Sequence, residues 1–128
     1  MLEEKARALI DAGNFATLTT LMPDGQPQTN IVWVDHDDGH VLVNTERHRQ
    51  KARNAVRDRR ATVLVWDRND MWSWVEIRGS VVEVVGGEEA RHHIDLMAKK
   101  YLGKDEYPNP IQTERVIIRI APTRQVVH

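Results

Sequence analysis

The pattern of hydrophobic and polar positions predicts a chain built mainly of short β-strands. FATLTTLM (15–22) and TNIVWVD (29–35) are rich in β-forming residues and flank PDGQPQ, in which Asp24-Gly25 favours a hairpin turn. The next stretch, VDHDDGHVLVN, repeats this arrangement with a second Asp-Gly turn before a strand at 41–45. Strands joined by such tight turns are antiparallel neighbours in a sheet.

The second half of the chain adds three further strands. ATVLVW (61–66) is dense enough in apolar residues to be covered on both faces. The alternation over 72–86 is interrupted only at Gly79-Ser80, which predicts one long strand with a bend or bulge. RVIIRI (115–120) predicts the last strand, and a tail containing Pro122 is expected to follow it.

Three segments have helical rather than alternating periodicity: 2–12, about 50–58, and about 88–102. The third helix has acidic residues in its first turn, lysines in its last turn and Gly103 as its stop, so its charges suit the helix dipole. The buried face of the second helix is expected to consist of Ala52, Ala55 and Val56.

About six antiparallel strands with two or three helices predict a mainly β fold, a small β-barrel with peripheral helices. A parallel α/β sheet is disfavoured because hairpins rather than helical crossovers join most of the strands. The chain has 128 residues and shows no linker, repeat or low-complexity segment, so residues 1–128 are expected to form one domain.

Composition removes several classes of function. The absence of cysteine excludes disulfide scaffolds, thiolate zinc sites and cysteine nucleophiles. No apolar run approaches the ~20 residues that span a bilayer, and the charged start MLEEKARALI is unlike a signal peptide, so we expect a cytoplasmic protein without membrane contact. A net charge of -1 disfavours nucleic acid as a general partner.

The segment NTERHRQKARN (44–54) departs from this balance, because it gathers cations at the start of the second predicted helix, where the helix dipole repels them. Lys51 and Asn54 share a helix face, Arg49 can turn toward the same point, and free backbone N–H groups lie there too. These groups predict a site for a compact phosphate, anchored by Arg49 and Lys51, with His48 as a minor contact. The remaining cations of the run are expected to be solvated: Arg53, Arg57, Arg59 and Arg60.

No other constellation indicates side-chain catalysis. G-x-G-x-x-G, P-loop and nucleophile-elbow motifs are absent, and no acid–base pair stands out, which suits a protein whose cofactor carries the chemistry. DHDDGH (35–40) has the wrong spacing for a calcium loop, so it is expected to be a solvated hairpin tip rather than a metal site. His92 and His93 diverge on their helix and are expected at the surface.

Four segments, taken in their order and spacing, resemble the pyridoxamine 5'-phosphate oxidase-like split-barrel family: DGQPQTNIVW, VNTERHRQKARN, RDRRATVLV and VEIRGSV. The similarity covers about residues 14–121 and is greater to the flavin/deazaflavin oxidoreductase branch, whose members often use coenzyme F-420 (8-hydroxy-5-deazaflavin). It implies a homodimer of split β-barrels with two cofactor sites at the subunit interface. The chain lacks the C-terminal Arg/Trp-rich segment of true pyridoxamine phosphate oxidases, so vitamin B6 oxidation is not expected.

The same resemblance implies roles for particular residues. Arg49 and Lys51 would hold the cofactor phosphate with Asn54 nearby, in agreement with the charge pattern, and two strand segments would lie along the ring system. The implied cofactor-binding residues are Gln28, Asn30, Val32, Trp33, Asn44, Thr45, Arg49, Lys51 and Asn54.

Trp72 and Trp74 lie two apart on a strand and therefore point to one face. Two interpretations stay open: packing in the core or at the dimer interface, or an aromatic wall of the substrate pocket that faces the partner subunit's cofactor. Trp33 lies in a more apolar run and is expected to pack.

Three hypotheses of function follow. The first is an F-420-dependent oxidoreductase that transfers a hydride to a small unsaturated or carbonyl-bearing organic substrate, with no side chain clearly placed for catalysis. The second is an FMN-dependent oxidoreductase of the same fold. The third is a non-catalytic binding protein, either for a cofactor or for single-stranded nucleic acid; the near-neutral charge and the lack of aromatic residues among the arginines weigh against nucleic acid.

Overall fold

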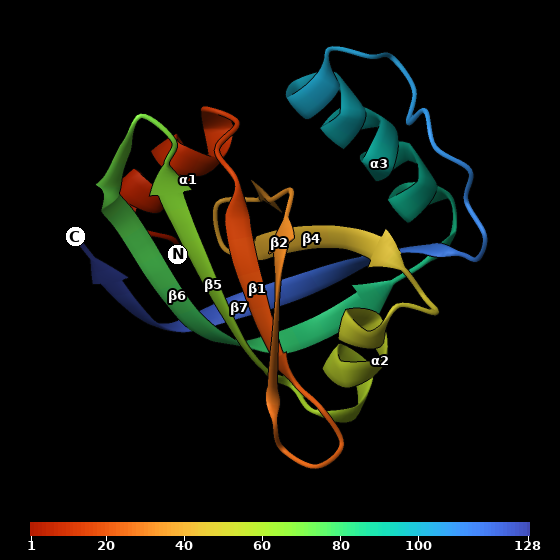
Figure 1. Ribbon diagram of the computed structural model, residues 1–128, viewed down its shortest axis with the longest axis horizontal. Coiled ribbons are helices and arrows are strands. Elements are labelled where there is room, and N and C mark those ends of the chain that lie inside the picture. Colours follow the sequence, from red (N-terminus) through yellow and green to blue (C-terminus); the bar gives the residue numbers. More distant parts are fainter.

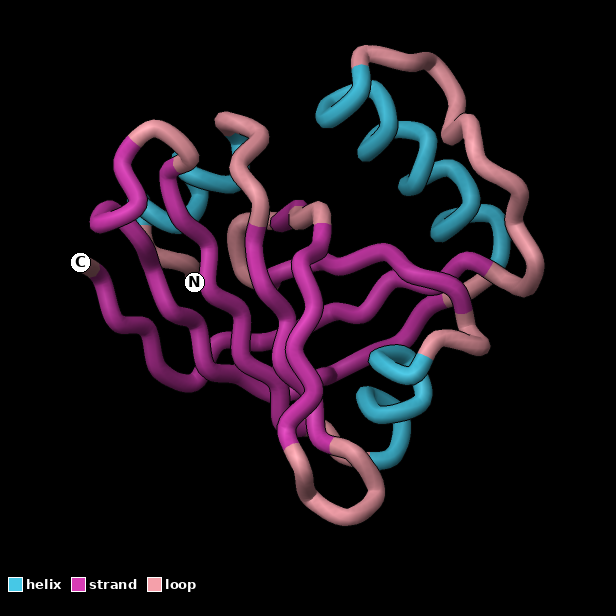
Figure 2. The backbone as a smooth tube through the Cα atoms, in the orientation of Figure 1, coloured by secondary structure: helices cyan, strands magenta, loops and turns pink.

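A computed structural model, which describes residues 1–128, shows a curled antiparallel sheet of seven strands with three helices around it (Figure 1, Figure 2). The strands lie in the order β2-β1-β5-β6-β7-β4-β3. Their bounds are β1 (Ala16–Leu21), β2 (Pro27–Val32), β3 (Asp35–His36), β4 (Val41–Glu46), β5 (Arg60–Asp67), β6 (Asp70–Val85) and β7 (Arg115–Val127). The helices are α1 (Glu4–Asp11), α2 (Gln50–Arg57) and α3 (Gly87–Leu102).

This architecture confirms the mainly β split barrel. The two-residue strand β3 was not predicted; it pairs with the start of β4 across the second Asp-Gly turn. No helix is both long enough and apolar enough to cross a membrane.

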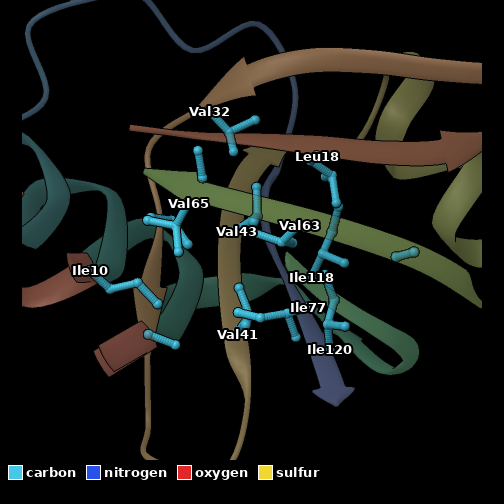
Figure 3. Packing of buried hydrophobic residues seen from close by; sticks show 14 of the residues in the cluster. Ile10, Leu18, Val32, Val41, Val43, Val63, Val65, Ile77, Ile118 and Ile120 are labelled. Carbon is cyan, nitrogen blue, oxygen red and sulfur yellow. The ribbon is translucent and has the colours of Figure 1, made fainter. Parts of the chain in front are cut away.

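The inner face of the curled sheet holds the core, a cluster of 19 buried residues contributed by α1, α2 and six of the seven strands or the residues beside them (Figure 3). Leu18, Val63, Ile77, Ile118 and Ile120 are all at most 1 % exposed. Each fully buried side chain of this size stabilises the fold by about 1.5–3 kcal/mol relative to exposure, so the barrel itself is a rigid support for whatever binds outside it.

The predicted bend in the long strand is confirmed. The register of β6 against β7 shifts between Arg78 and Gly79 and again between Val81 and Glu83. Such shifts increase local twist and let one strand turn a corner of a barrel. The bend allows β6 to pair with β5 from Asp70 to Ser80 and with β7 from Val75 to Val85.

The expected tail after residue 120 is wrong, because β7 continues to Val127 and this extension pairs with residues 75–80 of β6. Pro122 is opposite Gly79, and Arg124 is opposite Arg78, so Thr123 is left unpaired in a bulge. A proline is tolerated in a strand at such an irregularity because no ladder hydrogen bond is required of it there.

The predicted buried face of α2 is partly wrong. Ala52 and Ala55 are buried, but Val56 is 52 % exposed and Asn54 is completely buried instead. The Asn54 amide donates to Thr20 Oγ1 (3.1 Å), which turns this side of the helix toward β1. The prediction that ATVLVW is covered on both faces is also partly wrong, because its residues alternate between buried and half-buried along β5.

Candidate functional site

A cavity of about 400 Å³ lies outside the barrel, between β2, β4, α3, the start of α2 and the segment that leads into β7. Figure 1 shows the end of β4 between α3 and α2, with the connection from α3 running along the outer side of that helix to the start of β7. A volume of this size is within the range of small-molecule sites. The lining residues are Phe15, Ile31, Val32, Trp33, Asn44, Thr45, Arg49, Lys51, Ile94, Leu102, Tyr107, Asn109 and Arg115.

Three cations, Arg49, Lys51 and Arg115, line this cavity. No carboxylate lies within ion-pair distance of Arg49 or Lys51, whereas Arg115 Nη1 is 3.8 Å from Glu46 Oε2. Burial, followed by the charges of Arg49 and Arg115, lowers the pKa of Lys51. The cavity therefore has an excess of positive charge that an anionic ligand would neutralise.

The other basic residues of the run 47–60 are mostly paired. Arg47 binds Glu114 (2.7 Å), and Arg60 binds Asp58 (2.8 Å). Arg53 donates to Gln50, and Arg57 donates to Asn54 Oδ1 and to the Leu21 carbonyl. Arg59 is exposed and has no such partner. Arg49 and Lys51, which the sequence predicts as the phosphate anchors, are thus the unpaired cations of this run that line the cavity.

The first turn of α2 adds donors to the same end of the cavity. Arg49 is the N-cap, its side chain does not cap the helix, and the helix has no acidic residue in its first turn. The backbone amides of Gln50 and Lys51 have no acceptor within the chain, as is usual for a first helical turn that lacks a cap. The side chains of Arg49 and Lys51 and these free backbone amides together fit a phosphate group.

Aromatic side chains form another part of the cavity wall. Trp33 stacks on Tyr101 with ring centroids 5.2 Å apart, and Phe15 stacks on the same ring at 5.6 Å. Tyr107 meets Trp33 edge-on at 6.3 Å. The Tyr101 hydroxyl donates to the Asn14 carbonyl (2.8 Å), which fixes the stack to the segment just before β1. This wall is rigid and apolar, and it suits a planar ring.

The structure brings together six of the predicted cofactor-binding residues as cavity lining: Val32, Trp33, Asn44, Thr45, Arg49 and Lys51. Gln28 and Asn54 do not line the cavity and meet one another instead, with Asn54 Nδ2 donating to Gln28 Oε1 (3.3 Å). Asn30 is exposed on β2.

Trp72 and Trp74 are not brought to this cavity within one chain. They lie at the start of β6, where Trp72 is 78 % exposed and Trp74 stacks on His128 with centroids 5.0 Å apart. Their proposed place in a substrate pocket depends on a second subunit and stays a prediction.

Sequence reasoning missed Phe15, Tyr107 and Arg115 as cavity residues. The orientation of Arg115 could have been predicted from the sequence. Along β7, Arg115 and Ile117 alternate with Val116 and Ile118, so Arg115 faces away from the barrel core. Tyr107 and Phe15 had no such signal, since they lie in loops whose paths follow from tertiary packing.

The prediction that His93 is at the surface is wrong. His93 is 7 % exposed, its Nε2 is 2.9 Å from Asp35 Oδ2, and its Nδ1 is 3.1 Å from Asn44 Nδ2. The two polar partners satisfy both ring nitrogens, which makes burial of the imidazole possible.

The acidic and histidine-rich hairpin tip is held by internal pairs. His36 Nε2 contacts Asp11 Oδ1 at 2.7 Å, His40 Nδ1 contacts Asp37 Oδ1 at 3.0 Å, and Asp37 also pairs with Arg119. No group of three or more metal-ligating side chains forms here or elsewhere in the structure.

Glu46 fastens the segment that closes the cavity. Its Oε1 accepts hydrogen bonds from the backbone amides of Gln112 (2.8 Å) and Thr113 (2.7 Å). Burial alone would raise the pKa of this carboxyl, but these hydrogen bonds and the charge of Arg115 outweigh burial and lower it.

We expect Glu46→Gln to reduce hydrogen-exchange protection of the Gln112 and Thr113 amides about tenfold at neutral pH, because a hydrogen bond to a charged acceptor is stronger than one to an amide. Since the folded pKa lies below the ordinary value of 4.5, the stabilisation is present above about pH 4.5 and is lost as the pH falls through the folded pKa. Wild type and variant should therefore converge in acid. Glu106→Gln, in an exposed position of the same segment, is the control; equal effects of both variants would contradict this role.

The curled barrel, the unpaired cations and the adjoining aromatic wall define a split barrel of the class that binds flavins or deazaflavins. The chain belongs to the pyridoxamine 5'-phosphate oxidase family, whose sequence profile matches residues 2–126.

Solved structures agree with this family. The chain is similar to an F-420 reductase, with 26 % identity, a TM-score of 0.84 and 98 % of each chain covered. It is also similar to a conserved hypothetical protein from Mycobacterium tuberculosis, with 27 % identity, a TM-score of 0.76 and coverage of 98 % of this chain and 82 % of the other. General Stress Protein 26 from Bacillus anthracis shares the fold, with 22 % identity, a TM-score of 0.70 and coverage of 95 % and 89 %.

Proposed function

We propose that this protein is an oxidoreductase that uses coenzyme F-420 for hydride transfer to a small unsaturated or carbonyl-bearing organic substrate. The observation that carries the proposal is the pair of unneutralised cations, Arg49 and Lys51, in a cavity that the aromatic side chains of Phe15, Trp33 and Tyr107 also line. The likeness to an F-420 reductase over 98 % of both chains supports deazaflavin over other ring systems.

The residues of the cavity have separate roles in this proposal. Arg49, Lys51 and the free amides at the start of α2 bind the phosphate group, while Trp33, directly after β2, and Thr45 of β4 border the ring system. The chemistry supplied by the bound coenzyme is hydride donation from C5 of its reduced ring. The protein contributes orientation and the exclusion of water, which the apolar side chains of Ile94 and Leu102 favour.

A homodimer with two cofactor sites at the subunit interface is part of the proposal. The exposed Trp72 and Ile31 (70 % exposed) are large apolar side chains that a second subunit would cover. In such a dimer, Trp72 and Trp74 of one subunit would complete the substrate pocket of the other.

The test is the absorption spectrum of the protein after incubation with coenzyme F-420 or with FMN, followed by desalting. We expect F-420 to stay bound in stoichiometric amount and its reduced form to be oxidised when an enone acceptor is added. Retention of FMN alone would favour the FMN-dependent alternative. Retention of F-420 without turnover on any acceptor would favour a cofactor-binding protein, and retention of neither would refute the proposed site.

A further inference from the structure

Behind the cationic end of the cavity, four polar side chains from four different elements form a continuous hydrogen-bonded series. Asp35 of β3 is 2.9 Å from His93 Nε2, His93 Nδ1 of α3 is 3.1 Å from Asn44 Nδ2, and Asn44 Oδ1 of β4 accepts from Arg115 Nε of β7 at 2.8 Å. Asn44 and Arg115 line the cavity, whereas Asp35 and His93 do not. The series thus connects a half-buried acid and a buried imidazole to a cation that lines the cavity.

The direction of every hydrogen bond in this series is fixed by groups whose roles cannot be reversed. A guanidinium only donates, so the atom of Asn44 that faces Arg115 must be its oxygen. The Ala90 carbonyl only accepts, and it lies 2.9 Å from Asn44 Nδ2. The second hydrogen of Nδ2 then points to His93 Nδ1, which must accept. His93 is therefore neutral, with its hydrogen on Nε2 and donated to Asp35.

We propose that His93 is a positioning residue for anion binding: in its neutral form it holds Asn44, and through Asn44 it fixes the Arg115 guanidinium at the cationic end of the cavity. This inference rests on the proposed function for the identity of the anion, a cofactor phosphate. Asn44 engages Nε, Glu46 Oε2 lies 3.8 Å from Nη1, and the Tyr107 ring lies 5.0 Å from the guanidinium carbon, so only part of the hydrogen-bonding capacity of Arg115 is left for a ligand. Without Asn44, the neighbouring Glu46 carboxylate would be the strongest attraction for Arg115.

Protonation of His93 would reverse this arrangement. A hydrogen on Nδ1 would face the hydrogens of Asn44 Nδ2, and if the Asn44 amide turned to accept it, its NH₂ group would then face the Arg115 Nε–H. Either way the contact that positions Arg115 is broken. Of the charged groups, Asp35 on β3 contacts the imidazole, Lys100 on α3 acts on the Asp35 carboxylate, and Arg115 lies beyond Asn44. Burial would raise the pKa of the Asp35 carboxyl, but its hydrogen bond with His93 and the nearby positive charges outweigh burial and lower it. Acid should therefore weaken anion binding, although it adds positive charge.

The experiment compares wild type with His93→Gln, whose amide can accept from Asn44 and donate to Asp35 but does not titrate, and with His93→Leu, which can do neither. His92→Gln, an exposed neighbour on α3, is the matched control. Dissociation constants for F-420 and FMN are measured from about pH 8 to about pH 5, the range in which histidine changes charge. The ratio of the wild-type to the His93→Gln constant at each pH cancels the titration of the ligand itself.

We expect this ratio to be near one at the alkaline end and to rise about tenfold in acid, as the loss of a hydrogen bond to a charged group implies. His93→Leu should bind about tenfold more weakly than wild type at alkaline pH, and His92→Gln should follow wild type throughout. A ratio that stays constant with pH, or His93→Leu binding as tightly as wild type, would overturn the role of His93.

A second measurement needs no cofactor. In ¹⁵N NMR spectra of the protein alone, His93 should show the Nε2–H tautomer, and the Arg115 Nε–H signal should be protected at alkaline pH and lost in acid in wild type but not in His93→Gln. If this signal behaves as expected while neither coenzyme binds, the positioning role stands and the proposed function fails. If both coenzymes bind while His93 shows the Nδ1–H tautomer, the proposed function stands and the positioning role fails.

Discussion

Removing both unpaired cations by the double change Arg49→Ala and Lys51→Met is expected to weaken F-420 binding by about 100-fold or more. Each hydrogen bond from a charged group to phosphate is worth about 1.5–3 kcal/mol, and each 1.4 kcal/mol is a factor of ten in affinity. Methionine is chosen at position 51 because the half-buried side chain should keep its packing while losing its charge. Each single change should cost about tenfold.

Fluorescence titration at two salt concentrations measures this effect. Arg53→Ala is the matched control, because Arg53 lies on the same helix, carries the same charge and binds Gln50 outside the cavity. The control should leave the dissociation constant within about twofold of wild type. If the double variant bound F-420 as tightly as Arg53→Ala, the phosphate would not lie at the start of α2.

Gly79→Ala is expected to destabilise the barrel by about 3 kcal/mol, at the upper end of the usual cost of overpacking. A Cβ atom at this position would lie 2.4 Å from the Ala121 carbonyl oxygen and 2.7 Å from Ile120 Cγ2. The oxygen belongs to the backbone of β7, so it can move away only if the paired strands separate at the bend. The free energy of unfolding should fall accordingly, by urea titration, with the m-value unchanged.

Gly39→Ala, in the turn between β3 and β4, controls for the general effect of adding a methyl group to a glycine of this chain. The nearest atom to its new Cβ is Asp37 Oδ1 at 4.0 Å, so the substitution should change stability by less than about 1 kcal/mol. Equal stability of the two variants would show that the bend in β6 does not need glycine.

The candidate site was predictable to an unequal degree. Arg49 and Lys51 could be chosen from sequence because their position at a helix start opposes the dipole, and that conflict is a local property of the chain. The burial of His93 also had a local signal, since helical spacing places it on the face of Ala90, Ile94 and Met97. Its polar partners could not be predicted, because Asp35 and Asn44 arrive from other elements. The same holds for Asn54, which its contacts with Thr20 and Gln28 turn inward in place of Val56.

The order of hairpins, the long bent strand and the inverted charges of α2 were determined by the sequence itself, because turn chemistry, alternation and helix electrostatics act between residues close along the chain. Tertiary structure alone decided that β7 continues past Pro122, that Arg115 joins Arg49 and Lys51, and that Phe15, Trp33 and Tyr107 share one wall. These outcomes depend on pairings between residues far apart in the sequence, and no local pattern records which distant side chains will meet.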